Sequence, residues 1–176
     1  MRRLRYNVAM SLDGYIADSQ ERYDWIPDDN AVDFARLFAR VDTFVLGRRT
    51  YETVLANGEP PWQSGTRVYV LSRTLPAGPS GAVTVINGDP VALASSLRHE
   101  SGDGEIWLFG GGQLFASLLA ANQVDTVEIT VVPVLLGSGV PVVTVLPERV
   151  RLTLEHTQVY PSGMVALHYS VPDAAV

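Results

Sequence analysis

Three consecutive glycines, at positions 110–112, separate an apolar segment from an amphipathic one. Residues 105–109 are typical of a buried strand, and the pattern behind the glycines, to about residue 119, is typical of a helix. Glycine lets a ligand approach the main chain closely, and the free N–H groups of a helix start favour a phosphate. The segment therefore predicts an anion-binding turn, with an ordinary tight turn as the alternative.

Two further segments combine cations and hydroxyl groups with predicted strand ends. Gly47-Arg48-Arg49-Thr50 follows a short strand and opens a helix. Arginine suits phosphate because its planar guanidinium donates paired hydrogen bonds, and two cations at a helix N-terminus oppose the helix dipole unless an anion binds there. Leu71-Ser72-Arg73 ends the next strand with another hydroxyl and cation, although such a strand end by itself is usually only solvated.

A fourth segment, residues 8–17, places small and apolar side chains at the end of the first predicted strand. Such residues can present backbone groups to a flat ring without crowding it. The Asp13-Gly14 pair within this segment is also a common turn sequence. Ligands of open α/β sheets collect at the carboxyl ends of the strands, so the four segments together predict a site for a dinucleotide with an extra phosphate.

The elements that must position these residues alternate between strand and helix. Apolar patterns predict strands at residues 4–11, 43–46, 67–71, 82–86, 105–109, 124–132, 152–160 and 165–171. Helices are predicted at 30–40, with Asn30 as N-cap, at 49–56, and from Asp89-Pro90 to about His99, besides the one behind the glycines. We expect a three-layer α/β/α fold, with a mostly parallel sheet and a C-terminal antiparallel β hairpin at Pro161-Ser162-Gly163.

Composition limits the class of protein. The chain has 176 residues, of which 47% are hydrophobic and 18% charged, which is typical of a single globular domain over residues 1–176. The net charge of −6 and the lack of a basic run argue against a nucleic-acid partner. Because the chain has no cysteine, disulfides and thiolate catalysis are excluded. The histidines show no ligand spacing, so no metal site is predicted.

The most apolar stretch, residues 131–147, is interrupted by prolines and glycines. A membrane helix needs about 20 apolar residues in series, so this stretch predicts strand, turn, strand, and no membrane partner is expected. No targeting segment is visible. We expect a soluble, cytoplasmic protein that acts on a small molecule.

The order of these motifs resembles the dihydrofolate reductase fold family. The motifs are, in order, Ala9 with Asp13-Gly14-Tyr15-Ile16-Ala17, then 47–52, then 71–73, then 110–115. Residues 127–141, Val-Glu-Ile-Thr-Val-Val-Pro-Val-Leu-Leu-Gly-Ser-Gly-Val-Pro, are similar to one branch of that family. This branch is the reductase domain of bifunctional riboflavin-biosynthesis proteins, the RibD C-terminal domain, with its stand-alone bacterial relatives. The similarity covers nearly the whole chain.

The resemblance implies NADPH as the cofactor. The backbone at Ala9 and Ile16 would flank the nicotinamide carboxamide. The adenosine 2′-phosphate would be bound by Ser72 and Arg73, beside Leu71. The other phosphates would be held by Gly47, Arg48, Arg49 and Thr50, with Arg48 or Arg49 also near the 2′-phosphate. The pyrophosphate and nicotinamide would be cradled by Gly110, Gly111, Gly112, Gln113 and Leu114, and the Gly-Gly bond there is typically cis in the family.

The implied reaction is hydride transfer from NADPH to a heteroaromatic or carbonyl small molecule, similar to that of 5-amino-6-(5-phosphoribosylamino)uracil reductase. We predict Asp33 as the catalytic carboxylate, and Asp13 and Thr130 as substrate residues. In folate reductases a strand threonine that aligns with Thr130 helps to bind the pterin. Two positions depart from the riboflavin pathway enzymes. Tyr15 replaces a substrate-contacting lysine, and Phe109-Gly110 stands where a glutamate precedes the glycine pair.

Two alternatives remain open. The chain could be a true dihydrofolate reductase, or a nucleotide-binding module of the same fold without turnover. Relatives in this branch often pair, so we also expect a homodimer, with the apolar C-terminal strands as its surface.

Overall fold

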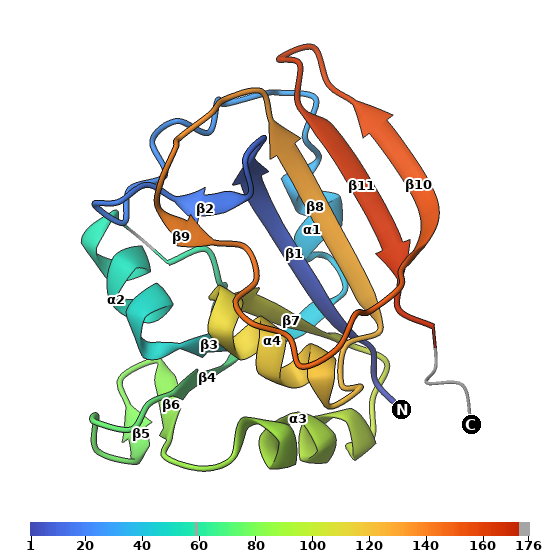
Figure 1. The fold of residues 1–176 in the computed structure, drawn as a ribbon. Coiled ribbons are helices and arrows are strands. Elements are labelled where there is room, and N and C mark those ends of the chain that lie inside the picture. The colour runs from blue at the N-terminus through green and yellow to red at the C-terminus, as the bar shows by residue number, and fades with distance from the viewer. Residues whose placement is uncertain (59, 173–176) are drawn as a thin grey trace.

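A nine-stranded sheet forms the centre of the structure, a computed structural model that describes residues 1–58 and 60–172 (Figure 1). Its strands lie in the spatial order β10, β11, β8, β1, β7, β3, β4, β6, β5. Their bounds are β1 (Leu4–Ser11), β3 (Val41–Gly47), β4 (Arg67–Leu71), β5 (Gly78–Ser80), β6 (Val83–Ile86), β7 (Glu105–Gly110), β8 (Thr126–Val132), β10 (Thr153–Val159) and β11 (Val165–Ser170). A separate ribbon pairs β2 (Tyr15–Ala17) with β9 (Val140–Pro141).

The six neighbouring strands from β8 to β6 run parallel, so their carboxyl ends share one edge of the sheet. At one side of the sheet, β11 pairs antiparallel with β8 and β10 pairs antiparallel with β11. The predicted mostly parallel sheet with a C-terminal antiparallel hairpin is confirmed.

Helices cover both faces of the sheet (Figure 1). On one face, α3 (Pro90–His99) and α4 (Gly112–Ala120) pack on a core that includes Ile106 and Leu108. On the other face, α1 (Phe34–Phe38) and α2 (Arg48–Ala56) contribute side chains to a cluster around Trp107. Neighbouring side chains of a strand point to opposite faces, so β7 supplies both cores. The predicted three-layer arrangement is confirmed.

The first predicted helix is much shorter than expected. Residues 30–40 were expected to be helical with Asn30 as N-cap, but α1 covers only Phe34–Phe38 and its N-cap is Asp33. The Asp33 carboxylate accepts a hydrogen bond of 2.9 Å from the Arg36 backbone N–H. Before it, the Val32 N–H donates to the Asp29 carbonyl in a turn. Short polar side chains here satisfy the backbone locally and so favour turns over helix.

Of the three shortest strands, β2 and β5 were not predicted, whereas β9 lies within residues 131–147, for which strand, turn, strand was expected. Each has only two or three residues, too few for a periodic pattern. Residues 131–147, expected to form strand, turn, strand, contain the end of β8 and the two residues of β9.

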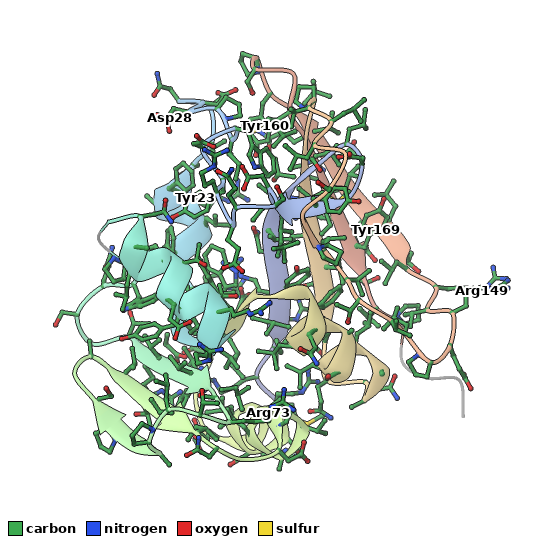
Figure 2. All side chains as sticks on the ribbon, turned by 60° about the vertical axis from the view of Figure 1, so that its left-hand side comes forward. Tyr23, Asp28, Arg73, Arg149, Tyr160 and Tyr169 are labelled. Carbon is green, nitrogen blue, oxygen red and sulfur yellow. The ribbon has the colours of Figure 1, made fainter. Side chains whose placement is uncertain are left out.

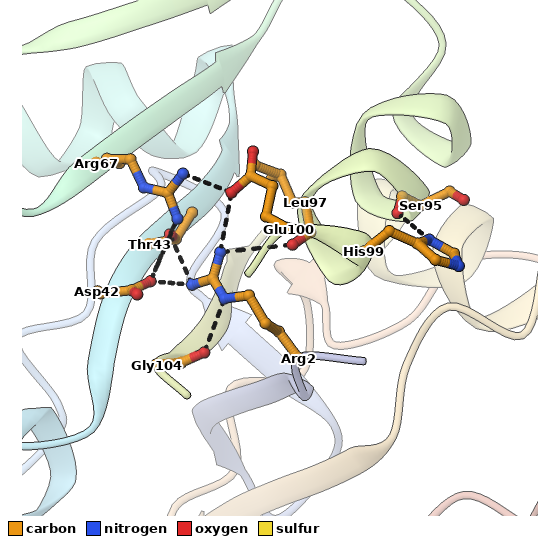
Figure 3. Close-up of polar contacts among 9 residues, drawn as sticks. All are labelled: Arg2, Asp42, Thr43, Arg67, Ser95, Leu97, His99, Glu100 and Gly104. Carbon is orange, nitrogen blue, oxygen red and sulfur yellow. Dashed lines mark hydrogen bonds and ion pairs between the residues drawn. The ribbon is translucent and has the colours of Figure 1, made fainter. Parts of the chain in front are cut away.

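Charged side chains join the amino ends of the strands, at the edge opposite the carboxyl ends (Figure 3). Arg2 is buried and forms ion pairs with Asp42, at the start of β3, and with Glu100 at 3.3 Å. Arg67, at the start of β4, pairs with the same Glu100 carboxylate at 2.6 Å. The network connects strands that lie far apart in sequence, and its members do not reach the carboxyl edge of the sheet.

A segment that we call the strap, residues 133–142, crosses back toward the first strand and its following turn. The Asp13 carboxylate accepts hydrogen bonds from the backbone N–H groups of Leu136 and Gly137, at 3.1 and 2.7 Å, and from the Ser11 hydroxyl at 2.6 Å. The Tyr6 hydroxyl donates to the Val142 carbonyl at 3.0 Å. Asp13 therefore fixes the strap in place.

Two glycines are required where the strap meets other segments. A Cβ atom on Gly112 would overlap the Pro141 carbonyl oxygen, and one on Gly139 would overlap the Ala17 carbonyl oxygen. The strap is thus packed directly on the start of α4.

Truncation of Leu108 tests the core. This side chain is 0% exposed at the centre of β7, so Leu108→Ala should lower the free energy of unfolding by about 3 kcal/mol through lost burial and a residual cavity. Urea denaturation measures the change. Leu135→Ala, at a residue 69% exposed, should stay within about 0.5 kcal/mol of wild type; equal losses would contradict the packing described.

The hydrogen bonds of the Asp13 carboxylate predict a pH-dependent contribution to the free energy of unfolding. Hydrogen bonds, first that from the Ser11 hydroxyl, lower the pKa of Asp13. Since the folded-state pKa lies below the unfolded value, the contribution is present above the unfolded pKa and is lost as pH falls through the folded pKa. Asp13→Asn should lower the urea midpoint at pH 7, and the difference from wild type should begin to shrink as pH falls below about 4, near the unfolded pKa, and vanish only below the folded-state pKa.

Asp103→Asn is the matched control for Asp13→Asn, because Asp103 is exposed and forms no hydrogen bond or ion pair with any residue that the structure describes. If the urea midpoint of Asp13→Asn stays equally far below that of wild type at acidic pH, the ionised carboxylate does not stabilise the strap as described.

Candidate functional site

A cleft of about 1550 Å³ opens at the carboxyl edge of the parallel strands. Pockets for one small molecule are roughly 300–1000 Å³, so this cleft has room for a long ligand and a second, smaller one. Most of the predicted site residues line it: Ala9, Ile16, Arg48, Arg49, Thr50, Leu71, Ser72, Arg73, Gly111, Gly112, Gln113, Leu114 and Thr130.

The N-termini of α2 and α4 meet at one end of the cleft. They follow β3 and β7, which are neighbours in the sheet, and their N-caps, Gly47 and Gly111, provide no side-chain cap. A Cβ atom on Gly111 would lie 3.4 Å from the Thr50 hydroxyl oxygen, so the two helix starts are in contact. Uncapped backbone N–H groups and two helix dipoles point to an anion at this end.

The glycine turn that leads into α4 has the backbone conformation expected from the resemblance. The Gly110–Gly111 peptide bond is cis, and Gly110 has a φ of +133°, which glycine adopts readily. Gly47 and Gly110 do not themselves line the cleft; they form the turns that start the two helices.

Three arginines lie at the same end. Arg48 forms an ion pair with Glu52 at 2.7 Å, one turn along α2. Arg49 and Arg73 form no ion pair with other residues in the described part of the chain. Buried Ser72 accepts hydrogen bonds from the backbone N–H groups of Thr74 and Leu75, at 3.1 and 2.9 Å, and so forms the turn that carries Arg73.

Aromatic side chains form the other end of the cleft. The rings of Trp107 and Phe109, alternate residues of β7, lie 5.4 Å apart, and Phe38 lies 5.0 Å from Trp107. Phe34, also a lining residue, is 57% exposed. In Figure 2, Tyr23 and Asp28 lie in the upper part of the molecule and Arg73 lies in the lower part. The wall suits a flat, apolar ring.

A buried polar network supports this wall from below. The Arg5 guanidinium lies 5.1 Å from the centre of the Trp107 ring, donates to the Leu37 carbonyl of α1, and pairs with Glu105 at 3.5 Å. The Trp107 indole N–H donates to the Asn7 carbonyl at 3.0 Å. Trp107 is therefore held in one orientation at the floor of the cleft.

Four carboxylates from the loop between β2 and α1 also line the cleft: Glu21, Asp24, Asp28 and Asp29. Glu21 accepts a hydrogen bond of 3.5 Å from the Thr53 hydroxyl of α2, so it lies beside the helix that carries Arg48 and Arg49. Hydrogen bonds from Ser162, in the turn of the C-terminal hairpin, and from the Ala31 N–H lower the pKa of Asp29. This side chain ties the loop that carries the four carboxylates to the hairpin. Sequence reasoning missed the acidic loop, Asn7 and Trp107 as cleft residues. Only the burial pattern of the strand around Trp107 was visible beforehand.

Two predicted site residues, the catalytic carboxylate and one substrate residue, lie outside the cleft. Asp33, predicted as the catalytic carboxylate, does not line the cleft, because its carboxylate caps α1. Asp13 does not line it either, because its carboxylate is bonded to the strap. Thr130 does line it and lies opposite Ala9 in the register of β8 and β1.

Residues 1–58 and 60–172 contain neither a candidate metal site nor a candidate membrane-spanning helix. Within them, no group of three or more histidine, cysteine or acidic side chains could hold a metal ion. No helix in this part of the chain is long and apolar enough to cross a membrane.

Known proteins share both this sequence and this fold. The chain is 34% identical to the uncharacterized protein YwjB of Bacillus subtilis, over 92% of this chain and 94% of that one. A solved structure from Shewanella sp. PV-4, provisionally assigned to riboflavin biosynthesis, is 31% identical with a TM-score of 0.83, and the match covers 98% of this chain and 100% of that one.

A more distant structure shares the fold. It is a diaminohydroxyphosphoribosylaminopyrimidine deaminase/5-amino-6-(5-phosphoribosylamino)uracil reductase from Thermotoga maritima, which is 17% identical with a TM-score of 0.69 over 97% of this chain and 57% of that one. The model of the RibD C-terminal domain matches residues 2–166. With nearly the whole chain matched in sequence and in fold, the protein belongs to the RibD C-terminal domain family, whose fold is that of dihydrofolate reductase.

Proposed function

We propose that this chain is an NADPH-dependent reductase that transfers hydride to a heteroaromatic or carbonyl small molecule. The observation that carries the proposal is one cleft with two chemically different ends. One end has two uncapped helix N-termini and three arginines, and the other has a wall of aromatic rings. Phosphates suit the first end and a flat ring suits the second. Membership of the RibD C-terminal domain family, which typically uses NADPH, supports the same assignment.

The residues present fit the cofactor. The start of α4, from Gly111 to Leu114, would bind the pyrophosphate, and Ser72 and Arg73 would bind the adenosine 2′-phosphate. The absence of a side-chain cap on α4 is what such a ligand requires, because its oxygens take the place of the cap. Ala9 and Ile16 would flank the nicotinamide. NADPH supplies the hydride when bound.

The chain itself would contribute alignment and exclusion of water. Ala9 and Thr130 face each other in the register of β1 and β8, so a ring against Thr130 lies beside the position proposed for the nicotinamide. The strap adds Gly139, Val140 and Pro141 to the lining and would shield a bound cofactor from solvent on that side. Positioning of donor and acceptor in a sheltered cleft is the main contribution that a protein makes to hydride transfer.

Two findings bear on the alternatives. A dihydrofolate reductase was expected to use Asp33, and this carboxylate is occupied in capping α1. The riboflavin-pathway substrate is suggested by family membership, but Tyr15 stands where the pathway enzymes carry lysine. We therefore propose the reductase class without the pathway substrate.

A fluorescence titration with NADPH and NADH tests the cofactor assignment. The wild type should bind NADPH at least about tenfold more tightly, because a charge-assisted contact to the 2′-phosphate is worth about 1.5–3 kcal/mol. In Arg73→Ala the ratio of the NADH and NADPH dissociation constants should fall toward one. Arg149→Ala, an exposed arginine that does not line the cleft, should keep the wild-type ratio. Equal affinities of the wild type for NADH and NADPH would refute the proposed 2′-phosphate site.

Turnover separates a reductase from a binding module. Loss of NADPH absorbance should appear with at least one member of a panel of pterins, pyrimidines and quinones. Tight NADPH binding with no oxidation by any of them would favour the non-catalytic module instead.

A further inference from the structure

The two ends of the cleft carry opposite charges. All lining cations, Arg48, Arg49 and Arg73, belong to the end with the helix N-termini. The lining carboxylates, Glu21, Asp24, Asp28 and Asp29, come from the one loop between β2 and α1, whose helix provides aromatic wall residues. A ligand at the aromatic end is therefore close to negative charge.

Two of the four carboxylates are available to a ligand. Asp24 and Asp28 are exposed and form no hydrogen bond or ion pair with other residues that the structure describes. The cation nearest to them in sequence, Arg22, is paired with Asp18 at 2.8 Å and does not line the cleft. Neither carboxylate is ion-paired among the described residues, and the one cation that feels their charge is Arg22, whose pKa is raised first by Asp18 and also by Asp24.

An independent feature shows that this end is built for a ring. Phe34 and Tyr23 line the cleft but are 57% and 37% exposed. Large rings in a globular protein are usually buried. Exposed rings on the wall of a deep cleft, above a fixed Trp107, offer faces on which a flat ligand can stack.

We propose that the substrate is a flat heteroaromatic ring that carries no phosphate and is neutral or positively charged. This inference rests on the proposed function and names its substrate class. A phosphate on the ring would share this end of the cleft with Asp24, Asp28 and Asp29, and charges interact over roughly 8 Å at physiological salt. No arginine lines this end, and the chain contains no lysine. The site consequently repels the phosphorylated pyrimidines that a pathway enzyme would reduce.

Three probes with one ring and different charges test the substrate class. N-methylquinolinium, quinoline and a quinoline carboxylate are positive, neutral and negative at pH 7.5. Each is titrated by calorimetry into protein already saturated with NADPH. Affinity should fall in that order, by at least about tenfold from cation to anion, because the carboxylates attract a cation and repel an anion. Added salt should weaken the binding of the cation and strengthen the binding of the anion.

Removal of the two available carboxylates should abolish the differences in affinity among the three probes. In the double variant Asp24→Asn, Asp28→Asn, the three affinities should approach that of quinoline. The control Asp103→Asn, Glu148→Gln removes the same formal charge from exposed positions outside the cleft, and it should keep the wild-type order.

The outcomes are separable from those of the cofactor test. If NADPH does not bind, the proposed function itself fails. If NADPH binds and the anion binds as well as the cation, or the control variant changes the order as much as the double variant does, the inferred substrate class is wrong. If NADPH binds and none of the three probes does, the aromatic end is not a ring site.

Discussion

The parallel register of β1, β7 and β3 is the constraint on which the rest of the structure depends. These strands end at a common edge, so the turn after β3 and the turn after β7 lie side by side. Leu46 pairs with Gly110 across the two strands, and α2 and α4 then start on opposite faces of the sheet. A slip of the register by one residue would reverse the faces of Trp107 and Leu108. It would also separate the two helix starts, which together form the proposed phosphate-binding end of the cleft.

The two edges of the sheet have different physical roles. At the amino edge, Arg2, Asp42, Arg67 and Glu100 satisfy one another. At the carboxyl edge, helix N–H groups and the side chains of Arg49 and Asp24 keep their interaction capacity. Groups that would be costly to leave unpaired in a core are instead exposed in a cleft, where a ligand can pair them. This division explains how the fold is stable while its site stays open.

The charge contrast within the cleft follows from chain order. The loop between β2 and α1 supplies the acidic side chains, and the turns after β3 and β4 supply the arginines. Each segment reaches the cleft from a different strand, so their charges can vary independently on one scaffold. Members of a single fold family can in this way keep a cofactor site while the substrate end changes.

Local pattern alone was enough for the main strands, the glycine turn, the helix after it and the arginine-bearing strand ends, because periodicity and turn chemistry act between near neighbours in sequence. The short α1 escaped prediction, since the carboxylate of Asp33 competes for backbone N–H groups that a longer helix would use. Only tertiary structure decided that Asp13 holds the strap, across 124 positions of sequence, and that Trp107 and Asp28 line one cleft. Such pairings depend on strand register and loop closure, which bring together residues whose own sequence neighbourhoods carry no sign of each other.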